Sequence, residues 1–178
     1  MIFLGNILSF SGQIALTSSG LIKDRLKTLL AQILGLTLLA IANGVLGGVT
    51  GCIVNSVNVL RNIIWYKNKG GLAVKIIFTV TICGLSIISA NDNWLWLLPM
   101  ISGLVFLWGI DLDGWKFKIM VLVSTALWLP YDLFFVNYAA VAFDVFGVVF
   151  NAFTAWRIFK ELQASEKNQT ALEEKDKK

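Results

Sequence analysis

The stretch IVNSVNVLRNIIWYK, residues 53–67, sets polar side chains into a segment that is otherwise aliphatic and aromatic. The polar positions that matter most are Asn55, Asn58, Arg61 and Asn62. A second stretch, FGVVFNAFTAWRIFK at 146–160, repeats the pattern, because Asn151 precedes Arg157 by the same six residues that separate the first asparagine from the first arginine. What such residues do depends on the solvent around the helices that carry them.

The composition identifies that solvent as a lipid bilayer. The chain is 57% hydrophobic and 15% charged, with a mean hydropathy of +0.74, whereas a soluble domain carries about 25% charged residues. Long windows contain no charge at all: 1–22, 28–60, 76–91, 93–110 and 119–131. A membrane helix needs about 20 mostly apolar residues, so the sequence predicts a polytopic, all-α membrane protein. The net charge of +4 then bears on orientation and does not indicate nucleic-acid binding.

Hydrophobic windows and turn residues predict seven helices. Their expected ranges are 2–22, 26–42, 45–66, 72–89, 94–110, 116–134 and 137–160. The turns between them are marked by Gly, Asn and Asp pairs, such as Asn43-Gly44 and Asp113-Gly114. The last break is the least marked, because Pro130 could instead kink one long helix. Residues 161–178 form a polar tail, which we expect to fray after continuing the last helix briefly.

Basic residues orient the seven helices. They cluster after the first, third, fifth and seventh helices, at Lys23, Arg25, Lys27, Lys67, Lys69, Lys116, Lys118, Arg157 and Lys160. The alternate loops contain none. Because cytoplasmic loops are enriched in Lys and Arg, the pattern predicts an external N-terminus, a cytoplasmic C-terminus and a cytoplasmic tail.

The two asparagine–arginine stretches also predict an internal repeat. Aligning them superimposes the third helix on the seventh, which gives triple-helix repeats at 1–67 and 94–160 and a linker helix at 72–89. Two three-helix units joined directly would run in opposite directions, so the linker helix makes them parallel. Parallel repeats are a known transporter plan, with the substrate held between them near the membrane midplane.

Over nearly all of residues 1–160, the chain resembles the bacterial YgjV inner-membrane family, through KDRLKTLLAQ, NVLRNIIWYK and AWRIF. That resemblance implies a location in the inner membrane. The 3+1+3 plan is similar to that of the SWEET and PQ-loop transporters, which carry small solutes. The similarity implies that Asn55 and Asn151, which occupy matching places on the third and seventh helices, face a central path.

Four residues are candidates for solute binding: Asn55, Asn151, Asp144 and Trp128. Asp144 lies inside an apolar helix, and an intramembrane carboxylate is a candidate proton carrier or cation ligand. It could equally be a protonated carboxyl bonded to a neighbouring amide. Trp128 could stack on a ligand or simply pack. Asp132, by contrast, is expected at the solvated outer edge.

Other polar and small residues receive structural interpretations. Asn58 and Asn62 are expected to join helices through amide hydrogen bonds, and the two arginines to mark the cytoplasmic interface. The glycines form overlapping GxxxG pairs, which indicate either close helix packing or a homodimer face; they are Gly44, Gly47, Gly48 and Gly51.

The leading functional hypothesis is a carrier or facilitator of a small neutral polar solute in the bacterial inner membrane. The alternative is a non-transporting scaffold or accessory subunit that binds a partner helix. An enzyme is not expected, because the chain has no histidine and offers no nucleophile with a base. Cys52 and Cys83 lie in apolar segments without metal-ligand spacing, so we expect no metal or cofactor.

Overall fold

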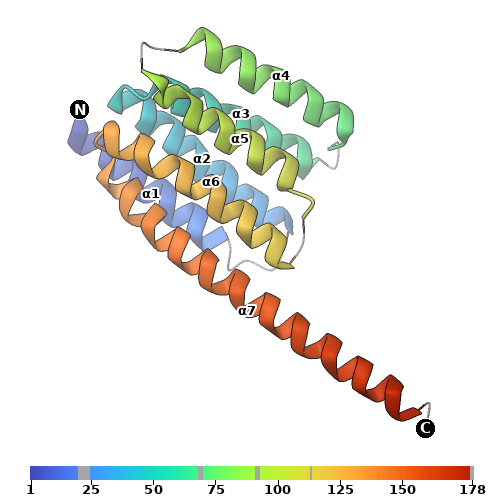
Figure 1. Cartoon of the computed structure of the whole chain (residues 1–178). Coiled ribbons are helices and arrows are strands. Elements are labelled where there is room, and N and C mark those ends of the chain that lie inside the picture. Colours follow the sequence, from blue (N-terminus) through green and yellow to red (C-terminus); the bar gives the residue numbers. More distant parts are fainter. Residues whose placement is uncertain (20–24, 68–69, 91–92, 113, 177–178) are drawn as a thin grey trace.

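The computed structural model describes residues 1–19, 25–67, 70–90, 93–112 and 114–176, with the backbone alone described for Arg25 and for 166–176. Within these ranges the protein is all-helical (Figure 1). The seven α-helices are α1 (Ile2–Ser19), α2 (Arg25–Leu46), α3 (Val49–Tyr66), α4 (Leu72–Ile88), α5 (Leu97–Gly109), α6 (Gly114–Phe134) and α7 (Tyr138–Asp176), with a short 3-10 helix at Trp94–Trp96. The predicted number of helices is therefore confirmed.

The turn between α2 and α3 lies later than the sequence indicated. Asn43 and Gly44 are inside α2, because the Asn43 side chain donates to the Leu39 carbonyl one turn back, at 3.1 Å. The helix ends instead in a Schellman motif. Gly47 adopts φ +87°, and Gly48 N–H donates to the Asn43 carbonyl at 2.8 Å. Gly47 therefore has the conformational role that a left-handed C-terminal position requires.

The break between α6 and α7 is present, and Pro130 lies inside α6. The turn again has the Schellman pattern: Asn137 N–H donates to the Asp132 carbonyl at 2.9 Å, and Val136 N–H donates to the Leu133 carbonyl at 3.2 Å. Val136 takes a positive φ of 59°, which is unusual for a β-branched residue. No glycine or asparagine marks this position, so turn chemistry could not have located it.

The last helix is longer than predicted. α7 continues to Asp176 and projects well beyond the other helices (Figure 1). The expectation of early fraying is wrong for the backbone, because the tail is rich in Glu, Lys, Gln, Ala and Leu, which are strong helix formers. Arg157 and Glu161 add an i,i+4 ion pair at 2.9 Å where the helix leaves the bundle.

Six of the helices close into a ring. α2 packs between α1 and α3, and α6 packs between α5 and α7. Contacts of α1 with α7 and of α3 with α5 join these two groups of three. α4 lies outside the ring, against α3 and α5 (Figure 1). A ring of this kind has an interior that no single helix fills.

Apolar packing is concentrated where α3, α4 and α5 meet. Val54, Ile82 and Leu107 are fully buried there. Two polar interactions join α4 to α5 and to the turn that follows it. The Lys75 ammonium pairs with the Asp111 carboxylate, and Trp108 Nε1 donates to Thr79 Oγ1 at 3.0 Å. α4 is thus fixed firmly to one side of the ring.

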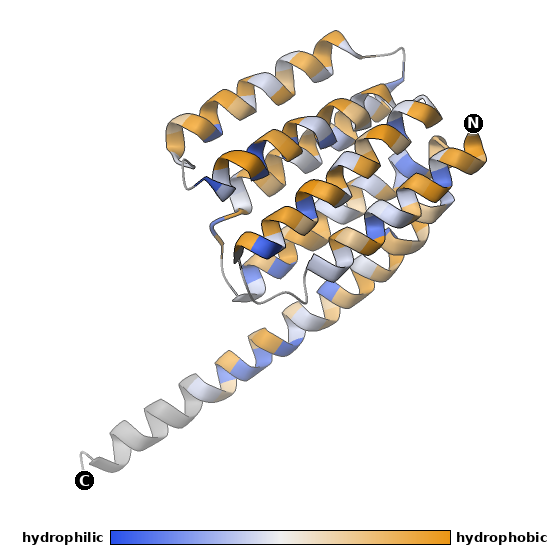
Figure 2. Ribbon diagram, turned by 180° about the vertical axis from the view of Figure 1, so that it is seen from behind, coloured by the Kyte–Doolittle hydropathy of each residue, from blue (hydrophilic) through white to orange (hydrophobic). Residues whose placement is uncertain are grey.

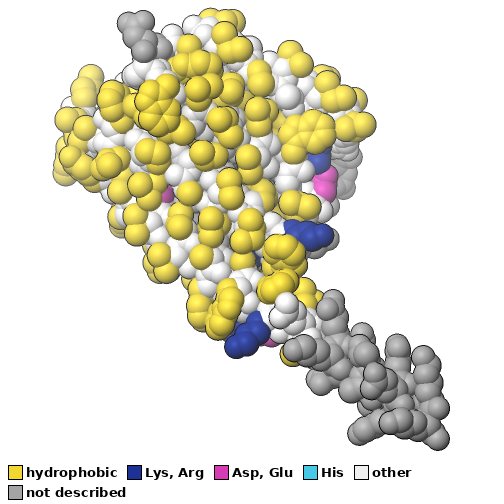
Figure 3. All heavy atoms as spheres, in the orientation of Figure 1, with side chains coloured by type: hydrophobic (Ala, Val, Ile, Leu, Met, Phe, Trp, Pro, Cys, Tyr) yellow, Lys and Arg dark blue, Asp and Glu magenta, His cyan; other side chains and the backbone are white. Residues whose placement is uncertain are grey.

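The outer surface is apolar, as Figures 2 and 3 show. Large side chains such as Ile77, Val80 and Val149 are more than half exposed. Three of the described helical segments are long and apolar enough to cross a membrane, Leu26–Leu46, Gly114–Phe134 and Tyr138–Ser165, and α4 and α5 are shorter apolar helices. α3 falls outside that group because its polar side chains lower its hydropathy. Most of these side chains are buried inside the protein. Lipid is the solvent that suits such a surface.

Candidate functional site

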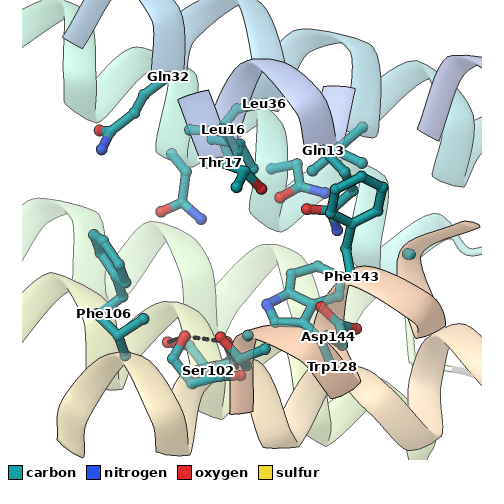
Figure 4. A pocket seen from close by; sticks show the side chains of 18 of the residues that line it. Gln13, Leu16, Thr17, Gln32, Leu36, Ser102, Phe106, Trp128, Phe143 and Asp144 are labelled. Carbon is teal, nitrogen blue, oxygen red and sulfur yellow. Dashed lines mark hydrogen bonds between the residues drawn. The ribbon is translucent and has the colours of Figure 1, made fainter. Parts of the chain in front are cut away.

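A cavity of about 380 Å³ lies inside the ring. All six ring helices contribute to its lining, and α4 does not. The lining is mixed: aromatic and aliphatic side chains alternate with amides, hydroxyls and a few charged groups. Figure 4 shows this arrangement, with Gln32 and Phe106 toward one end and Asp144 and Trp128 toward the other.

The structure brings all four predicted binding residues to this one cavity. Asn55 on α3 and Asn151 on α7 both line it, as do Asp144 on α7 and Trp128 on α6. Neither asparagine points to lipid, and the Asn55 residue is only 4% exposed. That they bind a solute stays a prediction.

The two asparagines differ in how much of their hydrogen-bonding capacity is used. Asn151 donates through Nδ2 to the Gly147 carbonyl of its own helix at 2.8 Å, which leaves its side-chain oxygen as an acceptor. The Asn55 side chain makes no hydrogen bond to any described residue, although it is buried. Because an amide offers two donors and an acceptor, Asn55 has the larger unused capacity.

Two carboxyl groups meet at one end of the cavity. Asp144 and Asp132 are 6% and 3% exposed, and their side chains are within hydrogen-bonding distance of each other. Asn137 Nδ2 donates to Asp132 Oδ1 at 2.9 Å, and Asp144 Oδ2 is buried without a partner among the described residues. Two buried carboxyls that face each other can share one proton, so this end of the cavity is a candidate proton-binding site.

The expected position of Asp132 at a solvated edge is wrong. The α6–α7 turn folds Asn137 back over the end of α6, and this residue is fully buried beside the aspartate. The turn is held from the other side of the ring as well. Asn6 of α1 donates to the Val136 carbonyl and accepts from Ala139 N–H, both at 3.0 Å. Polar side chains therefore replace water around the carboxyl.

A buried arginine occupies the opposite part of the cavity. Arg61 is 3% exposed, and its Nε and Nη2 donate to Asn62 Oδ1 at 3.1 and 2.9 Å. The remaining nitrogen, Nη1, is buried with no hydrogen-bond partner among the described residues. The guanidinium carbon lies 4.8 Å from the centre of the Phe106 ring, a cation–π distance.

Arg61 is therefore not the interface anchor that the sequence suggested. Asn62 holds it inward, because the same amide donates through Nδ2 to Gln32 Oε1 of α2 at 3.1 Å. The expected role of Asn62 in joining helices is consistent with this contact. Arg157, at the matching position of α7, is instead exposed and paired with Glu161, as expected of a residue near an interface.

The glycines of the α2–α3 region pack within the chain. A Cβ on Gly48 or Gly51 would lie 2.8 Å from an atom of Tyr131, and Gly51 N–H donates to the Tyr131 hydroxyl at 2.8 Å. Close helix packing thus accounts for these two. Gly44 is exposed, and the homodimer through this face stays a prediction.

Comparison with known proteins identifies the family but gives no solved relative. The family described as a bacterial inner membrane protein, Imp-YgjV, matches residues 3–161. The chain belongs to the YgjV family. It is accordingly a bacterial inner-membrane protein. No curated protein and no solved structure matched the chain.

In this YgjV-family chain, the charged cavity residues that sequence reasoning missed are Arg61 and Asp132. A signal for Arg61 was present, because it follows the inward-facing Asn58 by three residues, a spacing that keeps two side chains on neighbouring parts of one helix face. Nothing comparable existed for Asp132. Its burial depends on a turn and on an α1 amide far away in the sequence. Among the described residues, no cluster of three or more His, Cys, Asp or Glu could hold a metal.

Proposed function

We propose that this YgjV-family protein carries a small polar solute across the bacterial inner membrane, and that the solute occupies the cavity inside the ring. The cavity is the observation that supports this most directly. Its volume of about 380 Å³ lies within the range of small-molecule sites, roughly 300–1,000 Å³. Its lining includes a buried amide, Asn55, whose side chain makes no hydrogen bond to any residue that the structure describes. A merely structural amide would be expected to bond across helices.

The contacts between helices support two parallel repeats, 1–67 and 94–160, with α4 as the linker. Exchanging α1 with α5, α2 with α6 and α3 with α7 turns the α1–α7 contact into the α5–α3 contact. Both contacts are present. An axis that relates the halves would pass through the cavity, as in the parallel-repeat transporter plan. The similarity to SWEET and PQ-loop carriers enters here as part of the proposal.

The chemistry of the middle of the cavity suits hydroxyl or amide groups on the solute. Asn55 and Asn151 come from the two halves, and Gln13 adds a further amide from α1. Amides both donate and accept, so they can replace the water around a neutral polar group. The net charge of the solute depends on the two ends of the cavity.

Uptake into proteoliposomes tests the proposal, with a cavity-filling variant as the discriminating control. Gly147 lines the cavity, and a Cβ there meets a neighbour only at 3.4 Å, so Gly147→Leu places a side chain in the solute space. Gly84 on α4 has nothing within 4 Å, so Gly84→Leu adds the same atoms outside the ring. We expect Gly147→Leu to abolish uptake of radiolabelled polar solutes and Gly84→Leu to retain it.

Absence of uptake for the wild-type protein would contradict the carrier. Purification in fixed ratio with another membrane protein would then favour the alternative, a scaffold or accessory subunit. Equal uptake by wild type and Gly147→Leu would show that solute does not pass through this cavity.

A further inference from the structure

We infer that Arg61 is an anion-binding residue and that the transported solute carries a carboxylate. That the anion is transported rests on the proposed function. That Arg61 binds an anion does not. This inference replaces the expectation of a neutral solute, which assumed that Arg61 lay outside the cavity. The evidence is the arginine's burial, its missing counter-charge and the surroundings of its free nitrogen.

The first step concerns charge. The two ion pairs among the described residues join Lys75 with Asp111 and Arg157 with Glu161, so Arg61 has no carboxylate partner there. The buried guanidinium is contacted by one amide oxygen and one aromatic ring. A charge taken out of water is costly unless it is paired. The missing partner is therefore an anion, and the cavity is where it can enter.

The second step concerns geometry. Nη1 is buried and makes no hydrogen bond within the described part of the chain, while Nε and Nη2 donate to Asn62. The guanidinium thus keeps one free donor group, in a fixed orientation, beside the cavity. Asn58, which precedes Arg61 by three residues on α3, also lines the cavity, and its side-chain oxygen is buried without a partner. The Asn58 amide is available to a hydroxyl or protonated group on the same ligand.

The third step concerns which anion. The Phe106 ring lies 4.8 Å from the guanidinium carbon and lines the cavity (Figure 4), so an organic body next to the charge would be desolvated favourably. An inorganic ion would leave this ring without a contact. Lys118 on α6 also lines the cavity and adds positive charge at the same end. A small organic carboxylate satisfies all of these groups.

The carboxyl pair is too distant to be the second contact of so small a solute. Lys118 and Asp132 lie fourteen residues apart on α6, or about 21 Å by helical rise. The anion site and the proton-holding site are therefore separate places in one cavity. A carboxylate at Arg61 and a proton at the Asp132–Asp144 pair would enter the cavity as a neutral combination.

The test is ligand binding to the purified protein in detergent, measured by thermal unfolding and by tryptophan fluorescence. The probes are sodium lactate and sodium propionate, their uncharged isosteres lactamide and propionamide, and sodium chloride and phosphate at equal ionic strength. We expect the carboxylates to raise the unfolding midpoint and the amides and inorganic salts to leave it unchanged. Equal shifts with lactate and lactamide, or a shift with inorganic anions alone, would overturn the inference.

Two variants locate the site. Arg61→Gln should weaken lactate binding about ten- to hundredfold, because a hydrogen bond to a charged group is lost, whereas Arg157→Gln removes an exposed, paired arginine and should leave it unchanged. Asn62→Asp conserves the size of the side chain and gives Arg61 an internal carboxylate at the atom that already accepts from it, and the Gln32 amide can turn to donate to the second carboxylate oxygen. This substitution should stabilise the ligand-free protein and weaken lactate binding at least tenfold. Retention of wild-type affinity in Asn62→Asp would exclude Arg61 as the site even if Arg61→Gln did not fold.

Failure of this inference and failure of the proposed function are distinguishable. Carboxylate binding without uptake into proteoliposomes would retain the anion site and remove the carrier. Uptake of neutral solutes, with no carboxylate-specific shift in the unfolding midpoint, would retain the carrier and remove the anion site.

Discussion

At the scale of single residues, the amides on α3 and α7 have unequal roles. Asn55 has its whole side chain free, whereas Asn151 already donates to the Gly147 carbonyl. A ligand can therefore gain both donor and acceptor bonds from Asn55 but mainly an acceptor from Asn151. The symmetry of their positions in the sequence does not extend to their hydrogen bonds.

We expect Asn55→Ala and Asn151→Ala each to weaken solute binding, with little loss of stability. One direct hydrogen bond to a neutral group is worth about 0.5–1.5 kcal/mol, or roughly two- to tenfold in affinity. The effect should be larger for Asn55. Competition of solutes for uptake measures it, with Thr154→Ala as the control, because Thr154 is half-buried, does not line the cavity and donates its hydroxyl to its own helix. A stability loss larger than the affinity loss would indicate a packing role.

The carboxyl pair leads to a prediction about pH. Asp132 is the titratable group that faces Asp144, and the cavity residues contributed by α1, α2 and α5 are all neutral. If Asp144 carries a proton with the solute, uptake should rise as the external pH falls, and Asp144→Asn should abolish this dependence while the protein still folds. Uptake at several external pH values checks this, with Glu161→Gln as an exposed carboxyl control. Loss of folding alone would favour a structural carboxyl.

At the scale of helices, hydrophobic windows predicted all seven elements because each is an apolar run bounded by polar or turn residues. Boundaries were predicted where turn residues mark them and missed where other contacts decide. Gly47, not Asn43-Gly44, ends α2, because Asn43 bonds its own helix. Val136 turns the chain with no signal in its residue type. Arg61 was misplaced because a basic residue near a helix end usually marks an interface, and only the Asn62–Gln32 contact turns it inward.

Alanine substitutions at two glycines should change the stability of the protein in opposite directions. A Cβ on Gly51 would lie 2.8 Å from Tyr131 and 3.0 Å from Asn43, so Gly51→Ala should destabilise the protein by about 1–3 kcal/mol through overpacking. Gly84 has nothing within 4 Å. Gly84→Ala should therefore stabilise α4 by up to about 1 kcal/mol, the difference in helix propensity. Thermal unfolding in detergent compares the two, and equal effects would contradict the packing at Tyr131.

At the scale of the whole molecule, the shared location of Asn55 and Asn151 could be predicted from their matching positions in the expected repeat, and that of Asp144 from its place on the same face of α7 as Asn151. The closure of the ring could not. It depends on the α1–α7 and α3–α5 contacts, which join segments far apart in the sequence and which no local pattern encodes. The position of α4 outside the ring could not be predicted from the sequence either, although the sequence analysis expected it to be a linker helix.

Topology is a testable property at this scale. If all seven helices span the membrane, the two termini lie on opposite sides, and the distribution of basic residues predicts a cytoplasmic C-terminus. A reporter fused after Lys178 should give a cytoplasmic signal, and one inserted at Asn91-Asp92-Asn93 should give an external signal. Both reporters on one side of the membrane would contradict seven spans and the parallel repeats together.

The position of α4 has a mechanical consequence. This helix packs against both α3 and α5 and covers their contact. The pairs Lys75 with Asp111 and Trp108 with Thr79 fix it there. The opposite seam, between α1 and α7, has no such cover and is held by the amide of Asn6 and the edge-to-face pair of Phe10 and Phe143. If the two halves move during transport, we expect the α1–α7 contact to open while the α3–α5 contact, covered by α4, stays closed.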